Sequence, residues 1–338
     1  MSGKASIVVL NWNGKPYLER CLSAALAQSY PDFEVILVDN GSTDGSVEYV
    51  SSRFPQVRIV ANEENLGFAE GNNVGIRASR GEFIATLNND TEADRLWLKE
   101  LVRAMISSPR IGLCASKMLL YDRPKIIDSA GVDMNLAAIA WDRKGGTPDR
   151  EGSEPVEVFG ACAGAALYRR QMLDEVGLFD EEFFIYLEDV DLAWRARMRG
   201  WRCLYVPTAK VYHVHSATMV EGSPIKNYLL GRNKVWTIIK DYPMPHLLLY
   251  LPIIAFYDLA SLQYTLLLKG DTSALRGRIA GLMGLRRFLK KRGAIQGEKS
   301  TPFSEIAKLL YPLESPLAMW RRYRYLREKG SQAQRETG

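Results

Sequence analysis

The sequence predicts an α/β protein with a mostly parallel sheet and helices on both faces. Over the first 120 residues, short β-branched runs alternate with amphipathic stretches of helical spacing, which is typical of parallel strands joined by crossover helices. The composition agrees: 47% hydrophobic and 25% charged residues exclude a disordered, a collagen-like or a multi-span membrane protein. The length of 338 residues fits two domains, or one enlarged domain with an appendage.

The predicted elements follow one another in a regular order. Strands are expected at 7–10, 34–39, 57–61, 82–87 and 111–116, separated by helices at 15–28, 44–53, 68–79 and 94–107. Residues 121–158 have few apolar runs and are expected to form a long, irregular surface excursion. Beyond them we expect a strand at 161–168, helices at 170–176 and 187–199, and strands at 201–206 and 209–214.

The chain changes character after residue 223. Residues 243–270 are its most apolar segment, but Pro252 and Asp258 interrupt it, whereas a simple bilayer span needs about 20 predominantly apolar residues. We therefore expect an apolar hairpin of two short helices at a membrane surface, with one tilted span as the alternative. Residues 276–292 form a basic amphipathic stretch that suits anionic headgroups; the alternative is a solvated helix packed on the core.

The charge distribution supports this division. Residues 269–338 hold sixteen Lys or Arg against six Asp or Glu, a balance of +10, which leaves −5 for residues 1–268 because the whole chain carries +5. A basic tail fits membrane headgroups or nucleic acid, and the adjacent apolar run favours the membrane over nucleic acid. The four scattered cysteines and the N-terminal residues, which do not read as a signal peptide, predict a reducing compartment.

Two polar clusters close the first two predicted strands. In LNWNG (10–14), Asn11 and Asn13 offer side-chain amides, although Asn-Gly is also ordinary turn chemistry. In VDNGSTDGS (38–46), Asp39 stands where a carboxylate suits a base or ribose, and Asp44 suits a helix N-cap. The loop after the first strand lacks GxGxxG, so the usual dinucleotide fingerprint is missing.

A third cluster, LNNDT (87–91), closes the fourth strand and contains Asn88 and Asp90. Because ligands bind beyond the carboxyl ends of parallel strands, these oxygens suit Mg²⁺ or Mn²⁺ held chiefly through a substrate's phosphates. A plain turn before the helix at 94 explains the same residues equally well.

The fourth region, VGLFDEEFFIYLEDVDLAWRARMRGW (176–201), places Glu188, Asp189 and Asp191 in the first helical turn, directly after an aromatic block. Acids there complement the helix dipole, but a carboxylate walled by aromatic rings also has a raised pKa suited to a general base. Downstream, VYHVHSAT (211–218) places His213 and His215 on one face of a strand, and a histidine there favours a metal ligand.

These clusters, in this order, resemble glycosyltransferase family 2, the inverting nucleotide-sugar transferases with a GT-A fold, and most closely their bacterial rhamnosyltransferase-like branch. The matching stretches are SIVVLNWNG (6–14), VDNGSTDGS (38–46), ENLGFAEGNN (64–73), LNNDT (87–91), GACAGAALYRR (160–170), GLFDEEFFIYLEDVDLAWR (177–195) and VYHVHSAT (211–218). The resemblance implies a catalytic domain over 1–222 and a C-terminal helical region over 223–338 that resembles the family's membrane-associated tails only loosely.

For the donor nucleotide, the resemblance implies contacts from Asn11, Asn13, Asp39, Gly67, Asn72 and Asn88. Asp39 would contact the nucleobase, with Asn11 and Asn13 on the same nucleotide. The 65–73 loop, notably Gly67 and Asn72, would close over the nucleoside.

For the chemistry, the resemblance implies one base and one divalent cation, Mg²⁺ or Mn²⁺. Asn88-Asn89-Asp90 stands where the family keeps its D-x-D metal motif, so Asp90 would bind the ion through the donor diphosphate and Asn88 leaves one fewer negative ligand. Asp189 matches the general base, with Glu188 and Asp191 as possible supporting acids. His213 matches the histidine that completes the metal site, and His215 is assigned no role.

The implied reaction is inverting transfer from a nucleotide-sugar to a saccharide acceptor at the cytoplasmic face of the membrane, in cell-surface polysaccharide synthesis. Family likeness favours dTDP-rhamnose, with UDP-hexoses or galactofuranose donors next, and the tail favours a polyprenyl-diphosphate-linked acceptor. The rivals from other classes are an NAD-type oxidoreductase and a non-catalytic membrane-associated binding protein. The oligomeric state is open.

Overall fold

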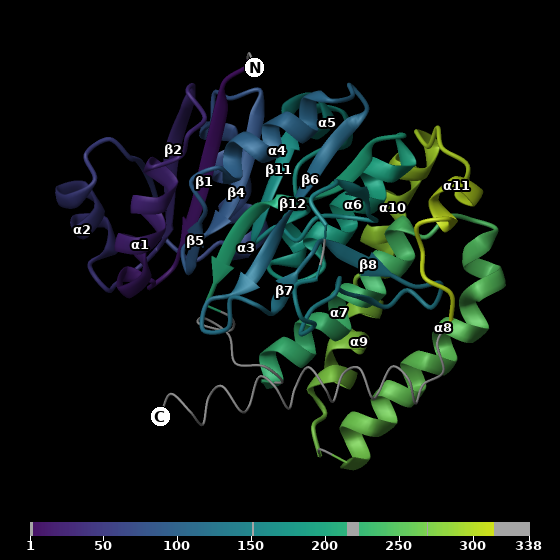
Figure 1. The fold of residues 1–338 in the computed structure, drawn as a ribbon. Helices are drawn as coiled ribbons and strands as arrows, with labels where there is room; N and C mark the ends of the chain where they lie inside the picture. The colour runs from purple at the N-terminus through teal and green to yellow at the C-terminus, as the bar shows by residue number, and fades with distance from the viewer. Residues whose placement is uncertain (1–2, 151, 215–222, 269, 314–338) are drawn as a thin grey trace.

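The computed structural model describes residues 3–150, 152–214, 223–268 and 270–313. Within these ranges one ten-stranded sheet forms the centre, in the order β10-β12-β6-β11-β4-β1-β2-β3, with β5 beside β12 and β7 beside β6 (Figure 1). The strands of the sheet are β1 (Ala5–Asn11), β2 (Phe33–Asn40), β3 (Arg58–Asn62), β4 (Phe83–Asn88), β5 (Thr91–Ala93), β6 (Ile111–Leu120), β7 (Ile127–Ser129), β10 (Val156–Glu157), β11 (Ala165–Arg169) and β12 (Arg202–His213).

Helices cover both faces of this sheet, as predicted. Those of the first 213 residues are α1 (Lys15–Leu26), α2 (Ser46–Arg53), α3 (Gly67–Ala78), α4 (Trp97–Ile106), α5 (Arg170–Val176), the short 3₁₀ helix η1 (Glu181–Phe183) and α6 (Glu188–Met198). The pairings β1–β2, β1–β4, β2–β3 and β6–β12 are parallel, and β11 runs antiparallel between β4 and β6. The sheet is therefore mostly parallel.

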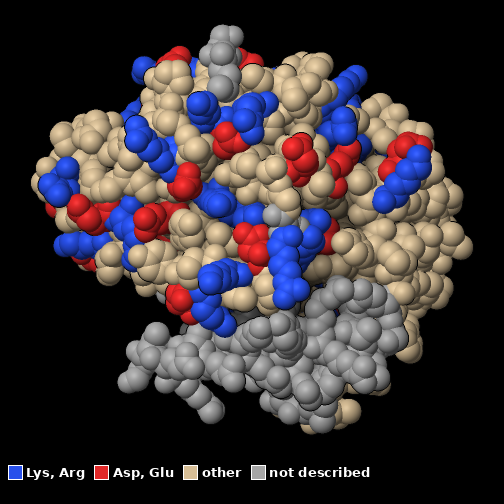
Figure 2. Space-filling view, in the orientation of Figure 1, with Lys and Arg blue, Asp and Glu red and all other residues tan. Residues whose placement is uncertain are grey.

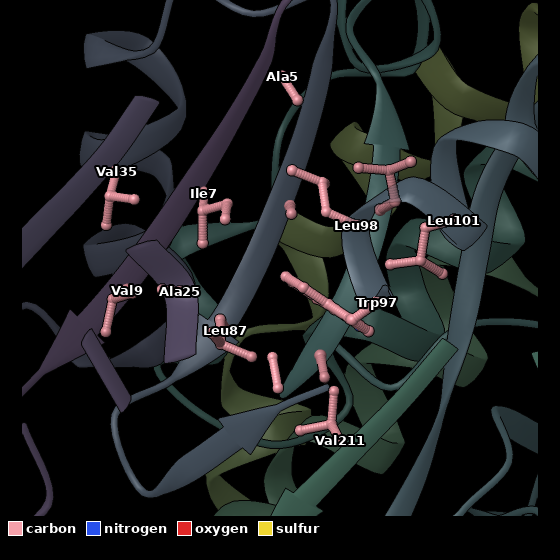
Figure 3. Close-up of a cluster of buried hydrophobic side chains, with 14 of the residues drawn as sticks. Ala5, Ile7, Val9, Ala25, Val35, Leu87, Trp97, Leu98, Leu101 and Val211 are labelled. Carbon is pink, nitrogen blue, oxygen red and sulfur yellow. The ribbon is translucent and has the colours of Figure 1, made fainter. Parts of the chain in front are cut away.

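Alternate residues of the central strands enter two separate cores. On one side, Ile7 and Val9 of β1 pack with Trp97 and Leu101 of α4 (Figure 3). On the other side, Val8 packs with Ile76 of α3 and with residues of α5 and α6. This division follows from the two-residue period of a strand, and it explains why the strands read as continuous apolar runs.

The register brings the predicted polar residues to one edge of the sheet. Asn11 pairs with Asp39, and Leu10 pairs with Asn88, so β1, β2 and β4 end side by side. Because parallel strands share the direction of their carboxyl ends, three clusters that are far apart in the sequence meet at this edge.

The segment 121–158 is more regular than expected. It contains β7 and β10, and a two-stranded sheet formed by β8 (Val132–Met134) and β9 (Ala140–Asp142). Val132 and Met134 are buried, against helix α6 among others. These strands have two or three residues, too few to show a pattern in the sequence. The predicted strands 201–206 and 209–214 are in fact one strand, β12, with a register shift between Val206 and Lys210.

The C-terminal region is helical: α7 (Pro224–Asp241), α8 (His246–Gln263) extended by the π-helix η2 (Tyr264–Leu268), α9 (Ser273–Met283), α10 (Leu285–Gly297) and α11 (Phe303–Ala307). The predicted hairpin over 243–270 is wrong, because α8 and η2 form one unbroken rod. Pro252 lies inside α8 and removes only one intrahelical hydrogen bond. Among the described helices, 246–267 is the one long and apolar enough to cross a membrane.

The C-terminal helices also complete the core of the catalytic part. Phe303 and Ile306 of α11 pack in one buried cluster with Trp194 of α6, and Phe288 of α10 packs with Phe183. The basic stretch 276–292 is split between α9 and α10 at Gly284. The division of the chain near residue 222 remains a proposal, since the two parts share these cores.

Candidate active site

A pocket of about 440 Å³ opens at the carboxyl edge of the sheet. Five acids line it, together with one histidine and one lysine: Asp90, Asp128, Asp142, Glu188, Asp189, His213 and Lys226. The sheet end, the 121–158 segment, the 183–190 loop and α7 therefore all contribute charged groups to one cavity.

His213 stands between two carboxylates on one wall of the pocket. Its Nδ1 is 2.6 Å from Oδ2 of Asp128, and its Nε2 is 3.3 Å from Oδ1 of Asp90. Burial lowers the pKa of His213, but Asp128 and then Asp90 outweigh burial and hold this pKa well above its usual value. Without a cation, the imidazole therefore carries a proton that offsets the two acids.

One carboxylate oxygen of Asp90, Oδ1, faces Nε2 of His213. This oxygen is buried and accepts no well-formed hydrogen bond, although a buried carboxylate oxygen normally has a donor or a cation. Within the described ranges, no three His, Cys, Asp or Glu side chains enclose a metal position by themselves. Asp90 and His213 therefore suit an ion whose other ligands come from a substrate and water.

Asp189 lines the same pocket at the start of α6. One of its oxygens accepts the backbone N–H of Val190 at 2.8 Å, and the other faces the N–H of Ala163 at 3.4 Å. Burial, followed by the negative charge of Asp142, raises the pKa of Asp189 to about 6. The carboxylate is thus held in place and poised to accept a proton near neutral pH.

Glu188 differs from its neighbour. It is buried, and its Oε2 has no hydrogen-bond partner. Burial, followed by the charge of Asp189, raises the pKa of Glu188 well above its usual value. Burial and Asp189 therefore both favour the protonated form of Glu188.

The loop before Asp189 has an unusual backbone that other elements hold in place. Phe184, Tyr186 and Leu187 all have positive φ values, 65°, 74° and 66°, a region that side chains normally avoid. The side chain of Asn233 on α7 donates to the carbonyls of Phe183, Ile185 and Tyr186 at 2.7–3.0 Å. These bonds compensate the strain and fix the loop that aims Asp189 into the pocket.

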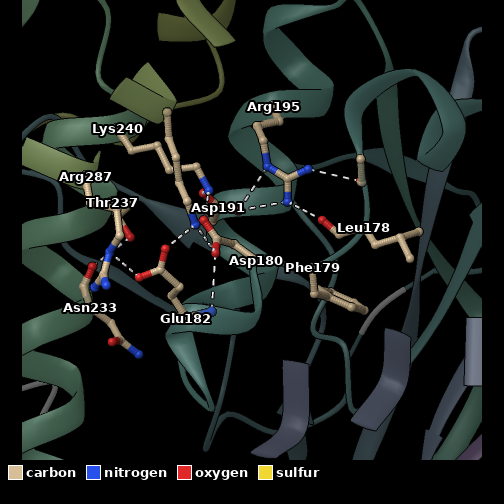
Figure 4. Close-up of polar contacts among 12 residues, drawn as sticks. Leu178, Phe179, Asp180, Glu182, Asp191, Arg195, Asn233, Thr237, Lys240 and Arg287 are labelled. Atoms are coloured by element: carbon tan, nitrogen blue, oxygen red, sulfur yellow. Dashed lines mark hydrogen bonds and ion pairs between the residues drawn. The ribbon is translucent and has the colours of Figure 1, made fainter. Parts of the chain in front are cut away.

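Asp191 lies outside the pocket lining and stabilises α6. It is fully buried between Arg195, at 2.8 Å, and Lys240, at 2.5 Å (Figure 4). Burial alone would raise its pKa, but Arg195 and then Lys240 lower the pKa of Asp191 to about 2. Its predicted supporting role is therefore best understood as structural.

The predicted nucleotide-binding residues form a network at the neighbouring strand ends. Asn11 donates to Asp39 at 2.8 Å, and the other oxygen of Asp39 accepts the N–H of Ser42 at 2.9 Å. The Oδ1 of Asn13 accepts the N–H of Thr43 at 2.8 Å. Asn11 and Asp39 are buried and lie behind the pocket lining, so their contact with a nucleobase stays a prediction.

Asn88 and Gly67 line the pocket itself, whereas Asn72 is buried and donates to the carbonyl of Phe68. Gly67 has φ +81°, and a Cβ there would lie 2.4 Å from the ring of Phe184. Only glycine fits, which explains how α3 and the loop before Asp189 come so close. His215 lies outside the described residues.

The family model described as "Glycosyl transferase family 2" matches residues 6–177, about half of the chain and all of β1 to α5. The chain belongs to glycosyltransferase family 2. This membership argues against the NAD-type oxidoreductase that the sequence left open. It also accounts for the polar clusters at the ends of β1, β2 and β4.

A relative in this family is the N-acetylglucosaminyl-diphospho-decaprenol L-rhamnosyltransferase of Mycobacterium tuberculosis. It is 28% identical over 268 residues, covering 71% of this chain and 85% of that protein. The match supports the predicted rhamnosyltransferase-like branch.

Two solved structures show the fold. The Staphylococcus aureus TarS fragment 1–349 superposes with a TM-score of 0.57 and 19% identity, covering 88% of this chain and 83% of that one. The mannosyltransferase PcManGT from Pyrobaculum calidifontis, in complex with GDP-Man and Mn²⁺, has a TM-score of 0.52 and 19% identity, covering 88% and 87%. The family 2 chain therefore has the predicted GT-A fold.

Two pocket acids of this glycosyltransferase escaped the sequence interpretation. Asp128 and Asp142 lie in the 121–158 segment, and tertiary contacts alone bring them to His213 and Asp189. Lys226 was also missed: it follows no strand, and its ammonium lies 5.3 Å from the ring centre of Tyr186 in the pocket wall. In a single sequence, an aspartate in a region with few apolar residues looks like any exposed surface acid, so Asp128 and Asp142 could not be predicted as site residues.

Proposed function

We propose that this family 2 glycosyltransferase moves a sugar, with dTDP-rhamnose as the leading donor, to a lipid-linked saccharide acceptor with inversion at the anomeric carbon. The supporting observation is that one pocket contains both a base of raised pKa, Asp189, and the pair Asp90–His213. A base on one side and a cation-binding pair on the other are what a single displacement of a diphosphate requires.

Asp189 would remove the proton from the acceptor hydroxyl. The hydroxyl oxygen forms the new bond to the anomeric carbon, the bond from that carbon to the diphosphate oxygen breaks, and the proton passes to the Asp189 carboxylate. Attack from the face opposite the leaving group inverts the anomeric centre in one step. Glu188, whose protonated form burial favours, would add less negative charge beside Asp189 than an ordinary glutamate.

Asp90 and His213 would hold a divalent cation through Oδ1 and Nε2, which face each other across 3.3 Å. A bound Mg²⁺ or Mn²⁺ supplies charge neutralisation for the departing diphosphate. Asp128 accepts the N–H at Nδ1 and so keeps Nε2 directed at Asp90. At Asn88 the site has a neutral amide in place of a second negatively charged ligand. The protein alone would therefore bind the cation weakly, and the donor's phosphates would supply most of the negative ligands.

The acceptor is inferred from the relative and from the tail. The name of the mycobacterial relative specifies a diphospho-decaprenol substrate, which supports a lipid-linked acceptor and, as part of the proposal, an enzyme at the cytoplasmic face of a membrane. The apolar helix α8 supports this location, because only 6% of its most apolar stretch of residues is buried against the protein. Membrane association is therefore part of the proposal.

The deciding experiment incubates the purified protein with dTDP-rhamnose, UDP-hexoses, UDP-galactofuranose and GDP-mannose, with Mg²⁺ or Mn²⁺. A decaprenyl-diphosphate N-acetylglucosamine acceptor is included, and released nucleotide and extended acceptor are both measured. We expect extension with dTDP-rhamnose and none with the Asp189→Asn control. Extension from a UDP-sugar alone would replace the donor assignment, and no transfer from any nucleotide-sugar would overturn the proposed function.

A further inference from the structure

α8 has two different faces along its whole length. One face packs on the protein through residues at spacings of three, four and four: Leu247, Tyr250, Ile254 and Asp258. The opposite face is apolar, with side chains 60–66% exposed: Leu248, Leu249, Phe256 and Leu259. An exposed apolar patch of this extent marks an interaction surface.

α8 is attached to the protein body at its start and at its middle. The ring of His246 stacks on Phe303 of α11 at 4.0 Å between ring centres. At the middle of the helix, Asp258 accepts from Lys234 Nζ at 2.9 Å and from Arg278 Nε at 2.6 Å. Since these partners belong to α7 and α9, the middle of α8 is joined to both helices by ion pairs.

These attachments decide how the helix can meet a bilayer. The 22 residues of 246–267 extend about 33 Å, so length alone permits a span of a core about 30 Å thick. A span would carry Lys234 and Arg278, with the helices that bear them, to the centre of the hydrocarbon, where charged groups are strongly unfavourable. A helix at the surface leaves both cations on the side facing the protein.

The neighbouring surface is suited to an anionic membrane. α9, which Arg278 joins to α8, exposes Ile279, Leu282 and Met283 beside Arg276. α10 exposes Arg286 and Lys290. In Figure 2, Lys and Arg are mixed with Asp and Glu over the face of the molecule that is in view.

We propose that α8 lies along the surface of a membrane containing anionic lipids, with its outer face inserted at the boundary between headgroups and acyl chains. The protein is then monotopic, and α8 does not cross the bilayer. Apolar insertion supplies the larger part of the binding, and the cations of α9 and α10 add attraction to the headgroups.

This orientation also bears on how an acceptor arrives, a point that rests on the proposed function. Beyond the end of α8, Asp271 accepts from Asn227 at 2.6 Å. Asn227 belongs to the first turn of α7, whose Lys226 and Leu230 line the pocket. The C-terminal end of the membrane helix is therefore next to the pocket, where a lipid-anchored diphosphate sugar would enter.

The test measures depth at two places on the outer face. Leu248→Cys and Leu259→Cys are made in a Cys162→Ala background, because the other three cysteines are buried, and each is spin-labelled and bound to phosphatidylcholine–phosphatidylglycerol vesicles. A flat helix gives both labels the same shallow depth. A spanning helix separates them by up to about 16 Å, eleven residues at 1.5 Å each, and this result would overturn the proposal.

A second arm tests the surface itself by vesicle sedimentation of the full chain. Leu249→Glu with Phe256→Glu should weaken vesicle binding by about 100-fold, since each lost burial is worth about tenfold or more. Ile106→Glu, at a residue 44% exposed on α4, should change binding less than about twofold. The membrane proposal would be contradicted if the wild-type protein did not sediment with vesicles and instead formed a dimer through this face. Retained transfer to a soluble acceptor analogue would show that the proposed function survives.

Discussion

Nδ1 of His213 lies 2.6 Å from the carboxylate of Asp128, a residue 85 positions earlier in the chain. The Nδ1–H donates to this carboxylate, so Nε2 is left to face Asp90 across 3.3 Å. A carboxylate behind a histidine ligand fixes the ring and increases its affinity for a metal ion. Asp128 is thus the positioning residue of the candidate metal site.

Asp128→Asn should weaken Mn²⁺ binding by about 10- to 100-fold, because an amide orients the imidazole less strongly and does not raise its basicity. Titration of Mn²⁺ by electron paramagnetic resonance measures this directly. Asp122→Asn, an exposed acid in the same segment, is the matched control and should bind Mn²⁺ as the wild type does. Chelation with EDTA should abolish transfer, and full activity in the chelator would exclude a metal role for Asp90 and His213.

Asp189→Asn should reduce kcat by about 10²- to 10⁴-fold, the usual contribution of general-base catalysis, while donor affinity changes little. The amide has the same shape but accepts no proton. Glu188→Gln is the matched comparison: burial already favours the neutral form of Glu188, so the neutral amide should cost only a few-fold. Single-turnover kinetics and donor titration separate the two effects, and a variant Asp189→Asn that keeps more than a tenth of the activity would exclude it as the base.

The pH dependence should follow the pKa of Asp189, about 6. The base acts as a carboxylate, so kcat/KM should rise tenfold per pH unit below about 6 and level off above it. Asp142→Asn removes a negative charge that raises this pKa, so the acidic limb should move to lower pH. The ionisation of donor and acceptor is the same with the wild type and with Asp142→Asn. The difference between their two pH profiles of kcat/KM therefore reports the effect of Asp142 alone. Coincident profiles would show that Asp142 does not act on the base.

The strands that carry the site could be predicted because their residues are buried on both faces. β1, β2 and β4 read as continuous apolar runs, and their polar ends at Asn11, Asp39 and Asn88 follow directly. Parallel pairing then brings those ends together without further information. The base at the start of α6 could be found for a similar reason, since three acids follow an aromatic block.

The remainder of the site depends on contacts that no local pattern encodes. Asp142 ends a three-residue strand, β9, whose partner is another three-residue strand. Asn233 on α7 lies 47 to 50 residues after the loop carbonyls that it binds, and only the fold shows that its amide reaches Phe183. The predicted hairpin failed because Pro252 was taken to end a helix that in fact continues through it.

Lys240 holds together the buried charges beneath the site, and its loss should destabilise the protein. Its Nζ is 2.5 Å from Asp180 and 2.5 Å from Asp191, and the side chain is 3% exposed (Figure 4). Lys240→Met leaves two buried carboxylates with fewer cations, and removing one partner of a buried pair typically costs about 3–5 kcal/mol. Lys291 still reaches Asp180, and Arg195 still reaches Asp191, so we expect the lower part of this range. Urea unfolding followed by circular dichroism measures the loss. Lys308→Met, which breaks an exposed pair with Glu305, should change the free energy of unfolding by less than about 1 kcal/mol.

If both variants unfold at the same urea concentration, the Lys240 contacts contribute no more to stability than a surface ion pair does. The link between α7 and the catalytic helix α6 is then not what stabilises the position of Asp189.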